Sequence, residues 1–463
     1  MKKRLSILAV AIAATFPMAQ TAHAQSNAEL KQEIDLLKKQ LQVLMQKVDA
    51  AAAASTSTAA SASNQGAVEL QEFNRIKIKA ESTEDAVEAS GLKGFKVSGV
   101  MDPTFIYSQG QNRSGFIFLN NFDGAGGAPL STDSYAFDNS SFGSAVLDIQ
   151  KETDGGNKWR LTLAPHKSGG SAYRAGSIVH EASVSIPLTD EKTRLIAGQI
   201  PDWSGYELTA ANQNPLVTHN LLFDFSAVTY YSGAGMEIIR GPWTSKFMLG
   251  NVNQAARESG DKDPALVYRV DYAVNEYSGI GLWGGHSFSS PSTSAGRFDM
   301  LEVDGYFTRG QLTLQGQVGA GRHEGKAGNG GDAQWWGLSG LVGYKLTPRT
   351  QLVARYDFIN NANNGGGVYN GVGGVGTLGD SRNGFGPAWE DDGTGTNTWF
   401  QPDPSTGVNR YALSVGLNYL INPTTSLKTE LRYDGASGAV FSQPDGSYKN
   451  TNLLFGTSVV VSF

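Results

Sequence analysis

The chain has 463 residues and lacks cysteine, so a disulfide framework, a thiol nucleophile and a cysteine-based metal site are all excluded. Glycine accounts for 57 residues, and charged residues for only 17 % of the chain, against ~25 % in ordinary soluble proteins. The net charge of −6 has the wrong sign for a general nucleic-acid binder. Past the N-terminus no run of about 18 apolar residues occurs, which excludes a protein that crosses a membrane with helices.

Residues 1–24 have the pattern of a secretory signal peptide. Lys2, Lys3 and Arg4 precede an apolar run from Leu5 to Phe16, and Ala22-His23-Ala24 forms a small-residue cleavage pattern. A single membrane anchor is the alternative, but the apolar run is too short to span a bilayer. We therefore expect the mature chain to be exported.

Residues 25–50 show apolar side chains at alternating spacings of four and three, which predicts a short coiled coil. An amphipathic helix packed on a domain is the alternative, and the pattern does not decide between a dimer and a trimer. Residues 51–93 are predicted to be a linker followed by a short segment, because 51–66 contain mainly Ala, Ser and Thr. The predicted coiled-coil core consists of Leu30, Ile34, Leu37, Leu41, Leu44 and Val48.

From residue 94 to the C-terminus the apolar residues alternate with polar or small ones, as in β-strands with one apolar face. The clearest segments are 311–321, 411–419 and 426–434. A soluble β-sandwich would also alternate, so the connections between the strands have to distinguish the two folds.

The connections alternate strictly between seven short turns and eight long segments rich in Gly, Asn, Asp and Ser. This predicts an all-β fold, a transmembrane antiparallel β-barrel of 16 strands over residues 94–463, with 18 strands as the alternative. The count takes 223–239 as one strand kinked near Gly233. The short turns are Lys151–Lys158, Leu188–Lys192, Arg240–Pro242, Asn275–Ser278, Arg309–Gly310, Thr347–Thr350 and Asn422–Thr425; the long segments are 108–136, 166–176, 201–222, 251–265, 289–298, 322–333, 359–409 and 435–451.

The last strand, 453–463, alternates Leu453, Phe455, Val459 and Val461 and ends on Phe463. With the signal peptide, the coiled coil and the barrel opening GFKVSGVMDPTFIYS, this chain resembles Gram-negative outer-membrane porins with an N-terminal periplasmic coiled coil, of the sucrose-porin and dicarboxylate-porin-like kind. It looks closest to an uncharacterised proteobacterial branch of porin-like proteins. In such proteins the C-terminal aromatic is the signal for barrel assembly.

The resemblance implies a location in the cell outer membrane with an N-terminal periplasmic segment, and a water-filled channel for passive diffusion of small hydrophilic solutes or ions. It further implies a homotrimer embedded in lipid and lipopolysaccharide. The alternative is a structural barrel that anchors the coiled coil, which would contact peptidoglycan. The sequence does not distinguish sugars, dicarboxylates or general solutes.

Porins narrow their lumen with the third long loop, and by this analogy 201–222 is expected to form the constriction. Its candidate residues are Asp202, Trp203, Tyr206, Glu207, Asn212 and Gln213, with Asp202 and Glu207 expected to oppose inward Arg and Lys side chains across the lumen. Charged side chains on the polar face of the strands should point into the channel, since a lipid-facing Arg or Lys costs ~2–4 kcal/mol at the bilayer midplane. These are Arg160, Glu181, Arg269, Asp271, Glu302, Asp304, Arg355, Asp357, Lys428, Glu430 and Arg432, many of which could simply pair across strands.

No catalytic site, metal site or cofactor is expected. No G-x-S-x-G motif occurs, and the glycine pattern at 371–376 has no strand-helix-strand unit around it. A Ser/His/acid set defined by geometry alone stays possible from sequence. Glu390, Asp391 and Asp392 could gather a divalent cation, although a solvated acidic turn is the simpler interpretation.

Overall fold

A computed structural model describes residues 75, 77, 93–110, 113–119, 143–164, 178–253, 264–287, 296–368, 385–395 and 397–463. The predicted signal peptide, coiled coil and 51–66 linker lie outside these residues. Residues 96–463 belong to one compact unit, and residues 21–95 to a second, in which Arg75 and Lys77 are helical.

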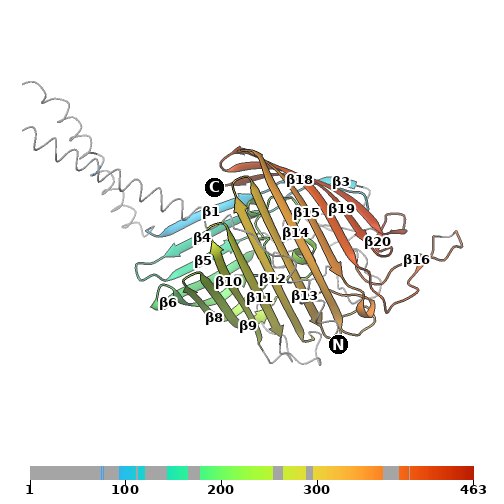
Figure 1. Ribbon diagram of the computed structural model, residues 1–463, viewed down its shortest axis with the longest axis horizontal. Coiled ribbons are helices and arrows are strands. Elements are labelled where there is room, and N and C mark those ends of the chain that lie inside the picture. Colours follow the sequence, from blue (N-terminus) through green and yellow to red (C-terminus); the bar gives the residue numbers. More distant parts are fainter. Residues whose placement is uncertain are drawn as a thin grey trace, which may run out of the picture. The chain divides into compact units, whose positions relative to one another are not determined.

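The first unit is a closed antiparallel β-barrel (Figure 1). Its strands are β1 (Phe95–Met101), β2 (Thr104–Ser108), β3 (Arg113–Ile117), β4 (Ala145–Glu152), β5 (Lys158–Leu163), β6 (Val179–Asp190), β7 (Thr193–Pro201), β8 (Tyr230–Arg240), β9 (Trp243–Val252), β10 (Ala265–Asn275), β11 (Ser278–Ser287), β12 (Phe298–Arg309), β13 (Leu312–His323), β14 (Ala333–Thr347), β15 (Thr350–Asn360), β18 (Arg410–Asn422), β19 (Thr425–Ala436) and β22 (Thr451–Ser462).

The described strands make 16 barrel staves, as predicted. β1 and β2 form one stave, because both pair with β22 and only Asp102 and Pro103 separate them. β3 and β4 form the second stave, since β3 pairs with β2 and β4 pairs with β1. Each remaining strand pairs with its neighbours in chain order, and the pairing of β22 with the first stave closes the barrel.

The alternation of apolar and polar residues along each strand determines which side chains point into the barrel. In the β18–β19 pair, Leu413 lies opposite Tyr433 and Val415 opposite Leu431 on the outer face, and all four are exposed. Between them, Ser414 lies opposite Arg432 on the inner face, and both are fully buried. The outer face is therefore apolar and the inner face polar, which is the reverse of a soluble sandwich.

The seven short turns lie where the sequence predicts them, but the first long connection differs. β2 returns directly into β3 through residues 109–112, so the long segment falls between β3 and β4, inside the second stave. Asp102, between β1 and β2, fixes the residues just before β4. Its carboxylate accepts hydrogen bonds from the backbone amides of Gly143 and Ser144, both at 2.7 Å. The prediction that 108–136 form one long connection was therefore wrong, because β3 occupies part of this segment. The predicted number of strands is not affected.

The segment predicted as one kinked strand, 223–239, is also different. Helix α4 (Leu221–Phe225) occupies its start, and β8 begins only at Tyr230. Asn220 caps the helix, because its side chain accepts a hydrogen bond from the amide of Phe223 at 2.9 Å. Leu221, Leu222 and Phe225 are buried within the barrel, so their apolar pattern reflects an interior contact and not a lipid-facing strand.

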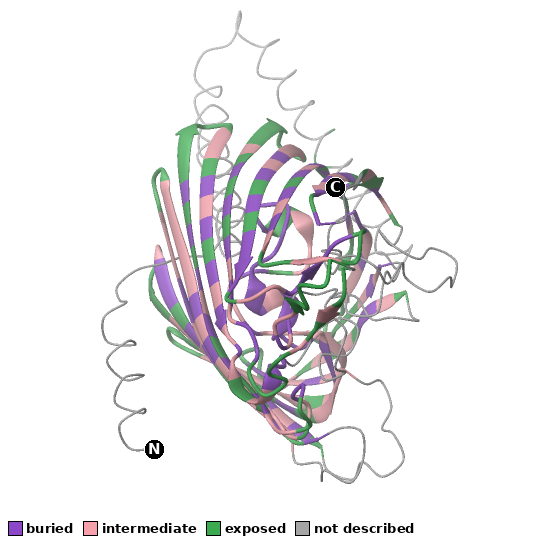
Figure 2. Cartoon of the chain, turned by 90° about the vertical axis from the view of Figure 1, so that its right-hand side faces the viewer, coloured by how far each residue is buried: buried purple, intermediate pink, exposed green. Residues whose placement is uncertain are grey.

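The long connections carry the remaining short elements, η1 (Ala211–Gln213), η2 (Asn363–Gly365), β16 (Glu390–Asp391), β17 (Trp399–Phe400), β20 (Phe441–Ser442) and β21 (Tyr448–Lys449). Figure 2 shows buried segments that are not barrel strands lying inside the ring of strands. In the part of the chain that the structure describes, no helix is long and apolar enough to cross a membrane.

Candidate pore constriction

The connection between β7 and β8, residues 202–229, lies inside the barrel; we call it the inner loop. It contains η1 and α4, and its side chains and backbone contact strands from β10 round to β22. Sequence reasoning placed the constriction here by analogy, and the structure places this segment in the lumen. Its role in limiting the passage of solutes stays a prediction.

Three strands hold the inner loop with the same local arrangement, an Arg followed two residues later by an Asp. The pairs are Arg269 with Asp271, Arg355 with Asp357, and Arg432 with Asp434. Since residues i and i+2 of a strand point to the same face, each Asp can accept a hydrogen bond from the Nε of its Arg. At least one terminal nitrogen of each Arg contacts the loop.

These terminal nitrogens donate to backbone carbonyls of the inner loop. Arg269 Nη1 donates to the carbonyl of Trp203 at 2.8 Å, at the start of the loop. Arg355 donates to the carbonyls of Thr218 at 2.7 Å and His219 at 2.8 Å, and Arg432 also reaches His219 at 2.8 Å. The loop is thus fixed at its start and at 218–219 by cations whose orientation is set by a neighbouring carboxylate.

Glu207 supplies the closest side-chain ion pair of the loop. Its Oε1 lies 2.9 Å from Arg355 Nη1, and its Oε2 accepts a hydrogen bond from the amide of Asn220 at 2.6 Å. Both Glu207 and Arg355 are almost completely buried. Glu207 and the inward-pointing Arg355 are therefore in direct contact, with no open lumen between their side chains.

Two further wall residues hold the middle of the loop. Glu430 accepts hydrogen bonds from the amides of Val217 at 2.9 Å and Thr218 at 2.7 Å. Lys428 donates to the carbonyls of Ala211 and Asn214, with Leu216 at 3.4 Å. A carboxylate and an ammonium group therefore satisfy the backbone donors and acceptors of a loop that has no strand partner here.

The beginning of the loop is fixed by Asp202. Its carboxylate accepts hydrogen bonds from the amide of Trp203 at 2.7 Å and from the hydroxyls of Ser204 and Tyr231. The Trp203 ring packs edge-on against Tyr231 with centroids 5.0 Å apart. Asp202 therefore organises its own loop and does not face a distant basic residue.

Glycines on the inner wall make room for the apolar side chains of the loop. A Cβ at Gly456 would lie 3.2 Å from Val217 Cγ1, and one at Gly337 would lie 2.8 Å from Leu222 Cδ2. The space that a side chain would fill is occupied by the loop instead. Glycine in these strands thus marks where another segment packs closely, as expected for a strand glycine.

All the charged residues predicted to line the pore share the inner face of the sheet by register. They divide into two groups by burial. The inner loop covers Glu302, Asp304, Arg355, Asp357, Lys428, Glu430 and Arg432, each at most 2 % exposed. Of the remaining four, Glu181 is buried beside Arg160, and Arg269 is 12 % exposed and contacts the loop, whereas Arg160 and Asp271 keep 46 % and 34 % side-chain exposure.

Two titratable groups of the inner loop are shifted by their surroundings. Burial raises the pKa of the Asp224 carboxyl to about 8, with the neighbouring Arg432 acting in the opposite direction. Burial lowers the pKa of the His219 imidazole to about 3. Asp224 is therefore protonated at neutral pH and His219 is uncharged, so the loop carries less charge than its composition suggests.

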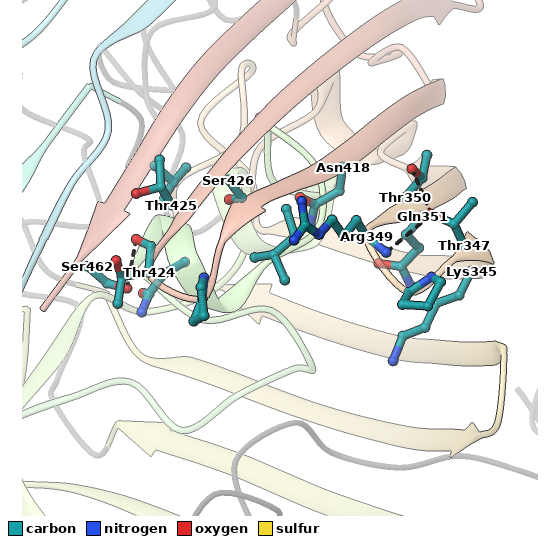
Figure 3. Close-up of a pocket in the computed structure, with 15 residues that line it drawn as sticks. Lys345, Thr347, Arg349, Thr350, Gln351, Asn418, Thr424, Thr425, Ser426 and Ser462 are labelled. Atoms are coloured by element: carbon teal, nitrogen blue, oxygen red, sulfur yellow. Dashed lines mark hydrogen bonds between the residues drawn. The ribbon is translucent and has the colours of Figure 1, made fainter.

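The tip of the inner loop reaches the short-turn end of the barrel. There Asn212 lines a pocket of about 420 Å³ together with the turns at Thr347–Thr350 and Pro423–Thr425 (Figure 3). Lys345 and Arg349 are the charged residues among its lining, which otherwise consists mainly of hydroxyl and amide side chains. The pocket opens beside the loop tip and would form one mouth of a lumen.

Sequence reasoning missed the shared Arg-x-Asp arrangement, although R-V-D at 269–271 and R-Y-D at 355–357 and 432–434 are visible in the sequence. Glu390 and Asp391 form the short strand β16, and Asp392 follows them; all three are exposed. Among the described residues, no group of His, Asp and Glu has the composition of a metal site.

Comparison with solved structures finds the same fold. The anion-selective porin from Comamonas acidovorans superimposes with a TM-score of 0.50 at 10 % identity, over 80 % of this chain and 99 % of that one. The outer-membrane protein OmpT of Vibrio cholerae scores 0.48 at 10 % identity, and the outer membrane channel DcaP of Acinetobacter baumannii 0.47 at 11 %, each over 80 % of this chain and 97 % of its own. The last two scores are too low to support an argument.

The fold is therefore that of a porin, a closed barrel of 16 antiparallel strands. The chain belongs to the family described as "Protein of unknown function (DUF3138)", whose model matches residues 68–261 and 270–463. Comparison with curated protein sequences gives no match.

Proposed function

We propose that this protein is an outer-membrane porin, a water-filled channel through which small hydrophilic solutes or ions diffuse passively. The observation that carries the proposal is the division of the inner wall. One side is covered by a firmly held inner loop, and the other keeps charged side chains exposed to solvent. A barrel that served only as an anchor would have no need for solvated charges in its interior.

The apolar outer face supports a location in the outer membrane, because exposed leucine, valine and aromatic side chains match lipid and not water. We further propose that residues 1–24 form a cleaved signal peptide, that 25–50 form a periplasmic coiled coil joined by 51–93 to the barrel, and that the chain assembles as a homotrimer. The homotrimer is proposed from the resemblance of the sequence to sucrose-porin and dicarboxylate-porin-like proteins.

Liposome swelling tests the proposed function. Purified full-length protein is reconstituted into liposomes, which are then diluted into isotonic sugars, amino acids or organic acids of increasing size. A channel gives swelling rates that fall with solute size and differ between solute classes. Swelling no faster than in protein-free liposomes for every solute would contradict the proposal and favour a structural barrel that contacts peptidoglycan through its coiled coil.

A further inference from the structure

The inner loop has three acidic side chains, and each is either paired, buried or hydrogen-bonded within the protein. Glu207 pairs with Arg355, Asp224 is buried, and both carboxylate oxygens of Asp202 accept hydrogen bonds. The loop contains no Lys or Arg. Its most exposed residues are Leu208, Asn212 and Gln213, which carry no charge.

The wall opposite the covered group is charged and solvated. On β5, Arg160 lies 2.7 Å from Asp148 and 3.3 Å from Glu181, whose side chains are only 11 % and 8 % exposed, against 46 % for Arg160. On β9, Lys246 pairs with Glu237 at 3.4 Å and is the more exposed partner. In both cases the cation projects towards the solvent and the carboxylates lie behind it.

Lys246 also connects this wall to the start of the inner loop, because its Nζ lies 5.9 Å from the centre of the Trp203 ring. Asp271 is the neighbouring acidic side chain. It is 34 % exposed, but its negative charge is paired with Arg269 at 2.7 Å. A solute passing along this side meets the side chains of Arg160 and Lys246, while the most exposed residues of the loop carry no charge.

We propose that the solute path follows the wall from β4 to β9, on the far side of the lumen from the strands that hold the inner loop, and that Arg160 and Lys246 set its charge selectivity. This inference rests on the proposed channel function. It differs from a constriction in which loop carboxylates face basic residues across the lumen, because the loop carboxylates are used to hold the loop in place.

The absence of cysteine allows a direct test of the path. Ser183 on β6 and Ser414 on β18 both lie on the inner face, but Ser183 is half-buried on the open wall and Ser414 is completely buried on the loop-covered side. We expect the sulfonatoethyl methanethiosulfonate reagent to label Ser183→Cys and lower its conductance in planar bilayers. The matched Ser414→Cys should stay unlabelled, and labelling and block at Ser414→Cys with none at Ser183→Cys would overturn the path.

Charge selectivity is tested by reversal potentials in a KCl gradient. Arg160→Gln and Lys246→Gln should each raise the cation-to-anion permeability ratio by about twofold or more, since each removes a positive charge from the path. The control is Lys158→Gln, which removes an exposed cation at the start of the same strand, beside the short turn. Unchanged ratios in both variants, or an equal change in the control, would overturn the inference while leaving the channel intact; a wild-type protein that does not conduct would instead overturn the proposed function.

Discussion

Arg355 is the side chain on which most of the inner-loop contacts converge. It is 1 % exposed, pairs with Glu207 and Asp357, lies 3.8 Å from Glu430, and donates to two loop carbonyls. A buried cation in such a position compensates several carboxylates at once. Its removal leaves those carboxylates without a counter-charge in a region with little water.

Arg355→Gln is therefore expected to destabilise the docked loop by roughly 3–5 kcal/mol, because it leaves the acidic partners of a buried ion pair without a counter-charge. The temperature at which heating converts the folded gel band into the unfolded band should fall. The noise of the single-channel current should rise. Arg160→Gln serves as the control for stability, because its side chain is half exposed and pairs with Asp148 and Glu181 of the wall. Equal effects of the two substitutions would show that Arg355 has no special part in holding the loop.

Asp224 makes the docking of the inner loop dependent on pH. Its pKa is raised to about 8 in the docked loop, whereas a solvated Asp titrates near ~3.9. Between these values the docked loop binds the extra proton, so docking weakens as the pH rises and levels off above about 8. His219, whose pKa is lowered to about 3, is neutral in both states above ~6.5 and adds nothing in that range.

We predict that the ratio of docked to released loop falls by about eightfold between pH 6.5 and 7.5 and more slowly as the pH approaches 8. The measurement is the time spent in the larger of two conductance levels in planar bilayers, which should increase with pH. Asp224→Asn should flatten this dependence. A time in the larger level that decreases with rising pH would contradict the assignment.

At the scale of elements, the barrel wall is shaped to receive the inner loop. Gly456 on β22 faces Val217 of the loop and Ile106 of β2, and a Cβ there would lie 3.1 Å from the Ile106 side chain and 3.2 Å from that of Val217. Overfilling a packed interior of this kind costs about 1–3 kcal/mol. The loop can move, whereas the strand is fixed by its ladder of hydrogen bonds.

Gly456→Val should therefore displace the loop and leave the barrel assembled. The expected result is normal heat-modifiable migration with a changed single-channel conductance. Gly340→Val on β14 is the matched control, since a Cβ there meets nothing within 4 Å. If both variants conducted like the wild type, the close approach of loop and wall would have no functional consequence.

The strands and the seven short turns could be predicted because both depend on local sequence, the period-two alternation and the turn residues. The split of the second stave could not, since it depends on Asp102 holding Gly143 across 41 positions. Helix α4 was mistaken for a strand because its apolar residues pack against the interior of the barrel. The contact of Arg355 with Glu207, 148 positions apart, exists only once the barrel has closed.

The inward direction of the charged residues follows from strand register, but their division into covered and exposed groups follows from the path of one loop. Arg355 and Arg160 look alike in the sequence, as basic residues on the polar face of a strand. One holds the inner loop and is buried, and the other faces solvent. The distinction arises at the scale of the whole molecule, where the loop leans against one side of the barrel.

For the whole molecule, we propose a barrel whose lumen is narrowed by a loop fixed to one wall. The most exposed residues of the loop, Leu208, Asn212 and Gln213, lie in the segment 208–213. Replacing residues 208–213 by two glycines gives up the contact of Lys428 with the carbonyl of Ala211 but keeps the contact of Glu207 with Arg355 and those of Glu430 with Val217 and Thr218. This variant separates the barrel from its constriction.

The most direct test compares the single-channel conductance of the wild type and this shortened-loop variant in planar bilayers, after heat-modifiable migration has shown that both are folded. We expect discrete conductance steps for the wild type and larger steps for the variant. Steps of equal size, or a wild-type protein that gives no steps, would contradict a channel narrowed by the inner loop.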